Sequence, residues 1–300
     1  MPIPQTRAAN APHLALVLGS GGVRSVAALG FADALISTGL EPDLVVGCSS
    51  GALFGACIAM GLNGDLGLNA ATRLWSAELT QQKRWRAILE LVAPRFMGFD
   101  ASFSLRDARL IHSRVQRAFG DACMEDLPIP LRVATTDCAT GESVVLSNGR
   151  VTDAVCASMA LPFIFPSVQI AGRRLCDGVI SDPLPVSAAR DADAVITLGF
   201  RGAMPRRIDR PSRLVAQITT AMINNLQQAR VDAVRAAGQR LLEIELEIDR
   251  RIGLWDTAAM PRIFEIGRRA AYDRLPEIRR LLEAPPRASF DPSLHRVSNQ

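Results

Sequence analysis

The chain has 300 residues, of which 48% are hydrophobic, and this composition predicts a protein with a large core rather than a disordered or fibrous one. Its 34 basic and 30 acidic residues give a formal net charge of +4, which is too mild and too dispersed to indicate a nucleic-acid partner. Six cysteines without a C-x-x-C pair are expected as reduced thiols in a cytoplasmic protein, and we expect neither a secretory leader nor a lipid anchor.

No internal repeat or linker divides the sequence, so we expect one α/β domain over residues 13–283. Residues 1–12 are expected to form a flexible N-terminus, and residues 284–300 a polar C-terminal tail. The order of elements predicted below, with buried strands alternating with helices, is typical of a mostly parallel sheet that helices cover.

The first predicted strand, Leu14–Leu18, runs directly into the glycine-rich loop Gly19-Ser20-Gly21-Gly22-Val23-Arg24, which opens a helix. The exposed N–H groups of such a loop are suited to bind negative charge. A dinucleotide fingerprint would need glycine where Arg24 stands and an acid after the next strand. An oxyanion hole needs only two open amides, which Gly21 and Gly22 supply. Arg24 either fastens the loop, meets a phosphate or is an exposed helix residue.

The second predicted strand, Leu44–Cys48, passes into a helix through one tight turn at Ser49. Gly47-Cys48-Ser49-Ser50-Gly51 matches G-x-S-x-G, in which Gly47 and Gly51 let the strand and helix approach each other. The Ser50 amide then lies where an oxyanion would form. A short G-x-S-x-G match is often a coincidence, but the strand before it and the helix after it make Ser49 a candidate nucleophile.

The uncharged run at residues 44–64 has the length of a membrane span, but its glycines and serines favour a buried strand and helix. A helical insertion follows at about residues 65–120, where apolar residues recur at helical spacing, and we expect it to cap the site. Within it, Lys83-Arg84-Trp85-Arg86 mixes cations with an aromatic ring and fits contact with a lipid surface, although a solvated helix face is the commoner origin of such a pattern.

After the insertion the predicted sheet resumes with strands at 130–136 and 143–146 and a short helix at 151–160. A hairpin at 168–175 then leads to Asp177 and Gly178. Further along we expect a helix beginning at Pro183, a buried strand at 193–200, a long helix at 212–237, a half-exposed edge strand at 241–248 and a closing helix at 260–282 interrupted near Pro276.

An aspartate before a glycine, such as Asp177, is most often a turn former. However, a serine hydroxyl is a poor nucleophile unless a base accepts its proton, and histidine usually does so. The histidines of this chain are His13, before the first strand, His112, in the insertion, and His295, near the end. None of them follows an acid strand as a hydrolase triad requires, so a carboxylate acting alone is the remaining candidate.

Four motifs together resemble the patatin-like phospholipases, and most closely the small bacterial members related to the catalytic domain of neuropathy target esterase. They are Gly19 to Arg24, Gly47 to Gly51, Ala157-Ser158-Met159-Ala160-Leu161-Pro162 and Asp177-Gly178. The similarity covers residues 14–200 and, more weakly, 252–282. It implies a three-layer α/β fold whose central sheet is mostly parallel and flanked by helices.

The resemblance also implies a Ser–Asp dyad in which Ser49 attacks an ester carbonyl and Asp177 accepts its proton and later activates water. It implies that the Gly21 and Gly22 amides hold the oxyanion and that Arg24 occupies the family's basic position. The other motif residues support this arrangement: Gly19, Gly47, Ser50, Gly51 and Gly178. Two positions depart from the usual pattern, because Ser25 stands where glycine is usual and Ser50 where alanine is frequent.

The activity that the resemblance implies is a phospholipase A, lysophospholipase or carboxylesterase with no metal and no cofactor. Its partners would be a phospholipid, a lysophospholipid or another fatty-acyl ester, with peripheral contact to a membrane by a cytoplasmic protein. Two other functions stay open, a catalytically silent relative that binds a lipid or a protein partner, and a nucleotide-binding protein.

Overall fold

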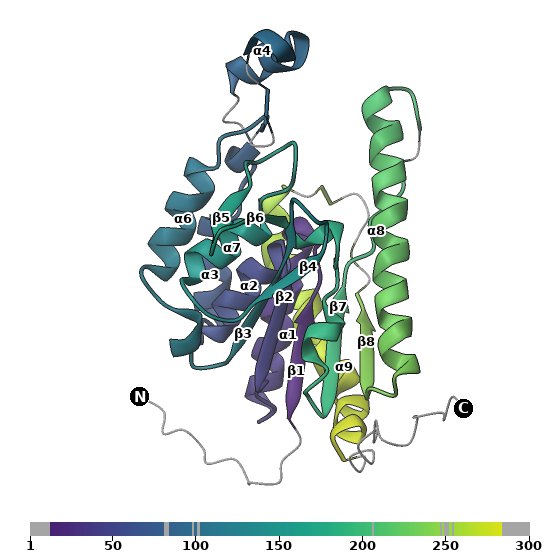
Figure 1. Cartoon of the computed structure of the whole chain (residues 1–300). Coiled ribbons are helices and arrows are strands. Elements are labelled where there is room, and N and C mark those ends of the chain that lie inside the picture. The colour runs from purple at the N-terminus through teal and green to yellow at the C-terminus, as the bar shows by residue number, and fades with distance from the viewer. Residues whose placement is uncertain are drawn as a thin grey trace, which may run out of the picture.

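A computed structural model gives the fold of the chain, in which the central sheet lies between two layers of helices (Figure 1). The structure describes residues 13–80, 84–97, 99–100, 103–205, 207–246, 248, 252–253 and 255–283. The expected N-terminal segment 1–12, the tail 284–300 and Lys83 lie outside the described residues. The three-layer α/β fold expected from the sequence is confirmed.

The sheet has eight strands within the described residues, in the order β5-β6-β3-β2-β1-β7-β8, with β4 also paired to β3. The strands β3, β2, β1, β7 and β8 run parallel, whereas β4, β5 and β6 are antiparallel to their neighbours. The loops that follow β1 and β2 therefore leave from the same edge of the sheet. The strand bounds are Leu14–Leu18 (β1), Leu44–Cys48 (β2), Leu131–Asp137 (β3), Ser143–Leu146 (β4), Val168–Ile170 (β5), Arg173–Asp177 (β6), Ala194–Gly199 (β7) and Leu241–Glu245 (β8).

The two faces of the sheet carry separate apolar clusters, because successive side chains of a strand point to opposite faces. In β1, the leucines at 14, 16 and 18 join the larger cluster, and Ala15 and Val17 join the smaller one. The helix α8 (Pro211–Ala236) and a 3₁₀ turn at Val186–Ala189 cover the smaller cluster. Those on the larger cluster are α1 (Ala27–Ser37), α2 (Ser50–Ala59), α3 (Gly64–Leu74), α6 (Arg109–Phe119), α7 (Val151–Ser158) and α9 (Met260–Glu283).

The expected insertion divides into two parts in space. The helices α3 and α6 pack into the core through Leu74, Ile111 and Phe119. The short helices α4 (Trp85–Val92) and α5 (Pro94–Met97) instead stand apart from the sheet, at the top of Figure 1. In the part of the chain that is described, no helix is long and apolar enough to cross a bilayer, and the uncharged run 44–64 begins with β2 and α2, both of them buried.

Three expectations about the second half of the chain were wrong in part. The helix expected at Pro183 is only the 3₁₀ turn Val186–Ala189, and β8 ends at Glu245 rather than at residue 248. The closing helix α9 continues through Pro276 without interruption. Proline removes one helical hydrogen bond, but buried Ala271 and Ile278 hold α9 to the core on both sides of it.

Candidate active site

Ser49 occupies the sharp turn between β2 and α2, with φ of 56° and ψ of −124°. A positive φ is strained for a residue other than glycine and is typical of a nucleophile elbow. Both flanking glycines are required by contact: a Cβ on Gly47 would lie 2.5 Å from Cα of Ala52, and a Cβ on Gly51 would lie 2.5 Å from the carbonyl oxygen of Leu18. The strand, turn and helix expected around Ser49 are therefore present.

Asp177, 128 positions downstream, lies directly beside Ser49, whose Oγ donates a hydrogen bond of 2.8 Å to Asp177 Oδ2. The other carboxylate oxygen, Oδ1, accepts the backbone N–H of Val179 at 2.9 Å. Asp177 is 3% exposed, and burial raises its pKa to about 7, against the opposing effect of the hydrogen bonds from Val179 and Ser49. Gly178 permits the close turn, since a Cβ there would lie 2.5 Å from the Ala134 carbonyl oxygen.

A group that the sequence analysis did not assign holds the nucleophile from behind. Buried Ser158, at the end of α7, accepts the Ser49 backbone N–H at 2.8 Å and donates to the Ala134 carbonyl at 2.7 Å. The Asp177 backbone N–H donates to the Ala160 carbonyl at 3.0 Å. Both contacts come from the motif 157–162, whose place in the chain order was the available signal, although its spacing does not reveal which atoms point to the elbow.

The glycine loop lies against the start of α2, and its amides are already paired. The N–H groups of Gly21 and Gly22 donate to Ser50 Oγ at 3.1 and 2.8 Å. Gly22 has φ of 62°, and a Cβ on Gly21 would lie 2.6 Å from the Phe200 ring, so both positions suit glycine. Gly19 fixes the beginning of the loop through its N–H, which donates to the Leu198 carbonyl at 2.9 Å.

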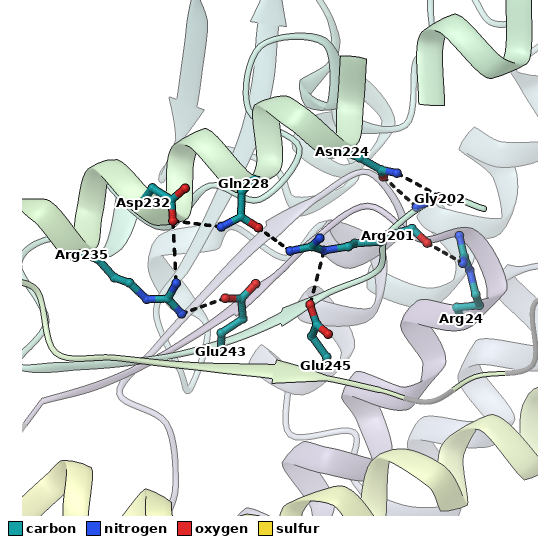
Figure 2. A network of polar contacts seen from close by, with 9 residues as sticks. All are labelled: Arg24, Arg201, Gly202, Asn224, Gln228, Asp232, Arg235, Glu243 and Glu245. Atoms are coloured by element: carbon teal, nitrogen blue, oxygen red, sulfur yellow. Dashed lines mark hydrogen bonds and ion pairs between the residues drawn. The ribbon is translucent and has the colours of Figure 1, made fainter. Parts of the chain in front are cut away.

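Arg24 fastens the glycine loop to the segment that follows β7. Its Nε donates to the Gly21 carbonyl at 3.3 Å and its Nη1 to the Arg201 carbonyl at 3.1 Å. Burial lowers the pKa of the Arg24 guanidinium from its usual value. Figure 2 shows that the Arg201 side chain is in turn held by Glu245 of β8 and Gln228 of α8, so two further elements stabilise the segment that Arg24 contacts.

A cavity of about 250 Å³ opens beside Ser49 and Asp177, and Arg24 and the glycine loop form part of its wall. The rest of the wall is mostly apolar. Trp75 and Trp255 stack on each other there, with ring centroids 4.6 Å apart, and neither was assigned from the sequence. The other large apolar side chains of the wall are Met159, Leu161, Phe165, Phe200 and Ile223.

Histidine is absent from the described residues that line this cavity. His13 precedes β1 and so lies at the edge of the sheet opposite the loop that follows this strand, and its N–H donates to Asp193. His112 is exposed on α6, and His295 lies outside the described residues. Among the described residues, the base that contacts Ser49 Oγ is the Asp177 carboxylate.

A family model described as patatin-like phospholipase matches residues 16–190, which is more than half of the chain. The matched range includes both Ser49 and Asp177. The chain belongs to the patatin-like phospholipase family.

Proteins similar to this chain in sequence carry names related to neuropathy target esterase. A Mycobacterium tuberculosis protein named as an uncharacterized NTE family protein is 34% identical over 213 residues, covering 68% of this chain and 54% of the relative. The neuropathy target esterase sws of Drosophila melanogaster is 32% identical over 183 residues, covering 60% of this chain and 12% of the relative. The chain thus spans about half the length of the bacterial relative.

Among solved structures, VipD from Legionella pneumophila aligns with a TM-score of 0.48 and 16% identity over 89% of this chain and 67% of VipD.

Proposed function

We propose that the chain is a serine acyl hydrolase of the phospholipase A, lysophospholipase or carboxylesterase type, which cleaves lipid carboxylic esters with Ser49 and Asp177 and without metal or cofactor. The observation that carries the proposal is the 2.8 Å hydrogen bond from Ser49 Oγ to Asp177 Oδ2 at a strained elbow, beside an apolar cavity. Membership of the patatin-like phospholipase family supports the choice of a lipid ester as substrate.

In the first half of the reaction Ser49 Oγ attacks the ester carbonyl carbon while its proton passes to Asp177 Oδ2. The carbonyl oxygen becomes an oxyanion beside the start of α2. Ser50 is the first residue of this helix, so its N–H has no acceptor within the helix and is the first donor to the oxyanion in this proposal. The Gly21 and Gly22 N–H groups are the further donors in this proposal. When the tetrahedral intermediate collapses, the bond to the alcohol oxygen breaks and Asp177 returns the proton to that oxygen, leaving Ser49 acylated.

In the second half the Asp177 carboxylate takes a proton from a water molecule, and the resulting hydroxide attacks the acyl carbon. A second oxyanion forms at the same donors, and its collapse breaks the bond to Ser49 Oγ, which recovers the proton from Asp177. An Asp177 with a pKa of about 7 suits both steps, because it accepts a proton near neutral pH and also releases it.

In this proposal, different parts of the cavity wall suit different parts of the substrate. The stacked Trp75 and Trp255 and the side chains of Met159 and Phe165 form an apolar surface that suits a fatty-acyl chain. Arg24 keeps guanidinium donors beyond its two bonds to backbone carbonyls, and it lines the same cavity. A phosphate of the head group is the partner that such donors suit.

The experiment that tests the proposal is labelling of the purified protein with a fluorophosphonate probe. We expect covalent labelling of Ser49, identified by peptide mass, and no labelling of Ser49→Ala. A silent binding relative would bind lipid and remain unlabelled, and a nucleotide-binding protein would copurify with an adenine dinucleotide; either result contradicts the proposal.

Contact with a membrane surface is part of the proposal, and exposed side chains on α4 and α5 support it. Val92 of α4 and Phe96 of α5 are exposed, Phe96 to 93%, and exposed Arg86 and Arg95 accompany them. Arg84, in contrast, turns inward and donates to Ser104 and Glu90. The cationic patch expected at residues 83–86 therefore contributes Arg86 to this surface, with Lys83 outside the described residues.

We expect the protein to sediment with vesicles of phosphatidylglycerol and phosphatidylcholine more strongly than with phosphatidylcholine alone, since the arginines favour an anionic surface. Replacing both Val92 and Phe96 with serine should weaken vesicle binding at least about tenfold, because each large apolar side chain contributes roughly 1.5 to 3 kcal/mol when buried. Leu66→Ser is the matched control, because Leu66 is 67% exposed on α3. Equal losses in both variants would contradict a specific docking surface.

A further inference from the structure

The side chain that follows the nucleophile in sequence occupies the two donors of the glycine loop. Ser50 Oγ accepts the Gly21 N–H at 3.1 Å and the Gly22 N–H at 2.8 Å. Ser25 Oγ lies 2.9 Å from Ser50 Oγ and donates to the Gly19 carbonyl at 3.4 Å. We propose that Ser25 and Ser50 form a hydroxyl latch that holds the loop donors in the resting enzyme and yields them to the oxyanion. This inference rests on the proposed function.

The direction of each hydrogen bond in the latch follows from counting protons and lone pairs. A serine hydroxyl has one proton and two lone pairs. The two N–H groups occupy both lone pairs of Ser50, so the Ser50 proton points to Ser25 Oγ. The Ser25 proton then points to the Gly19 carbonyl. The chain of bonds thus begins and ends on the glycine loop, and it ties the loop to the first residue of α2.

The latch is closed to solvent. Ser25 is 0% exposed and Ser50 is 1% exposed, so water does not replace either hydroxyl when the bonds change. The loop is also tightly packed at this point, since a Cβ on Gly21 would meet the Phe200 ring at 2.6 Å and Ser25 Oγ at 2.8 Å. The Gly21 and Gly22 donors therefore either remain on Ser50 or pass to an acceptor that competes with it.

The charge of the acceptor decides this competition. Hydrogen bonds to an ionised acceptor are about twice as strong as bonds between neutral groups. The oxyanion therefore displaces the Ser50 hydroxyl, whereas the neutral ester carbonyl of the bound substrate does not. Part of the stabilisation that the donors give the transition state is lost to this displacement, so removing the hydroxyl is expected to accelerate acylation. Ser25 and Ser50 are positioning residues in this scheme, because they act through the Gly21 and Gly22 amides.

The test compares wild type with Ser50→Ala, Ser25→Ala and the double variant. We measure the second-order rate of Ser49 labelling by a fluorophosphonate, kcat and KM for p-nitrophenyl butyrate, and the thermal unfolding midpoint. Ser50→Ala should be labelled about tenfold faster than wild type, the effect of roughly one net hydrogen bond, and should unfold at a lower temperature. Ser25→Ala should be labelled about threefold faster, because it weakens the latch without removing the acceptor.

A double-mutant cycle separates the latch from a merely structural role. Because Ser25 acts through Ser50, Ser25→Ala should change the labelling rate no further in the Ser50→Ala background. Ser104→Ala is the matched control: it removes an equally buried hydroxyl that contacts Arg84 instead of the loop, and it should lower stability without raising the rate. The acid limb of the pH profile should be the same in all variants, because Asp177 is unchanged.

The outcomes distinguish the latch from the hydrolase proposal. Labelling of Ser49 in every protein, with Ser50→Ala no faster than wild type, overturns the latch and leaves the hydrolase intact. Equal effects of Ser25→Ala in both backgrounds also overturn the latch. Absence of labelling in all of these proteins contradicts the hydrolase and the latch with it.

Discussion

Replacing Asp177 with asparagine is expected to slow ester hydrolysis about 10³-fold while the fold remains intact. Asparagine has the same shape as aspartate and still reaches Ser49, but an amide does not accept the serine proton. The residual rate comes from the oxyanion donors and from substrate binding, which the substitution leaves in place. The measurement is kcat for p-nitrophenyl butyrate, together with a thermal unfolding scan that establishes folding.

Asp182→Asn is the matched control for this experiment. Asp182 is 2% exposed and five residues downstream, and it pairs with Arg230 at 3.7 Å instead of contacting Ser49. Burial raises its pKa to about 6, so it resembles Asp177 in its environment but not in its partner. We expect this variant to keep the wild-type rate within about threefold. A rate for Asp177→Asn above a tenth of wild type would show that another group serves as base.

The parts of the site that were predicted from the sequence are those that local backbone geometry determines. A buried strand, a small-residue turn and a helix require a cramped conformation, so Gly47, Ser49 and Gly51 identify the elbow without knowledge of the rest of the fold. Gly21 and Gly22 follow β1 for a similar reason, and β1 and β2 are adjacent in the sheet. Asp177 came from the lack of a suitable histidine and from the family resemblance, and the structure brings it to Ser49.

The parts of the site that were not predicted are contacts between side chains of elements that are distant in sequence. Trp75 and Trp255 meet only because the insertion and the segment before α9 converge on the cavity. Ser25 was noted only as a departure from the family pattern, and Ser50 was expected to contribute its amide, yet in the structure their hydroxyl groups face each other. Spacing in the sequence does not reveal such contacts, since each depends on how whole elements pack.

The dependence on tertiary packing also explains why the interruption expected in the closing helix is absent. Pro276 was expected to interrupt it because proline lacks an N–H group, which is a correct local argument. The tertiary contacts of α9 outweigh that loss, since its apolar side chains lie against the core on both sides of Pro276. Local preference therefore predicts where α9 begins but not that it continues.

The rate of ester hydrolysis is expected to rise with pH and to level off above about pH 7. Burial raises the pKa of Asp177 to about 7, and only its ionised form accepts the proton of Ser49. The ionised fraction falls tenfold for each pH unit below the pKa, so kcat/KM at pH 5 should be about 1% of the plateau. The measurement is a profile of kcat/KM from pH 5 to 9. A profile that stays flat down to pH 5 would contradict a buried carboxylate base.

The same pKa makes a prediction about stability whose sign is opposite to that of activity. The pKa of Asp177 in the folded state, about 7, lies above the value of about 3.9 in an unfolded chain, so the folded state binds the proton more tightly. The stabilising contribution of protonated Asp177 is complete below about pH 4 and is lost as the pH rises through 7. Asp177→Asn removes this dependence, so its free energy of unfolding should exceed that of wild type by more at pH 8 than at pH 5, and this excess should grow by at most about 3 kcal/mol between the two pH values. Asp182 titrates in both proteins and cancels in the comparison. A difference between the two proteins that does not change with pH would show that Asp177 titrates outside this range.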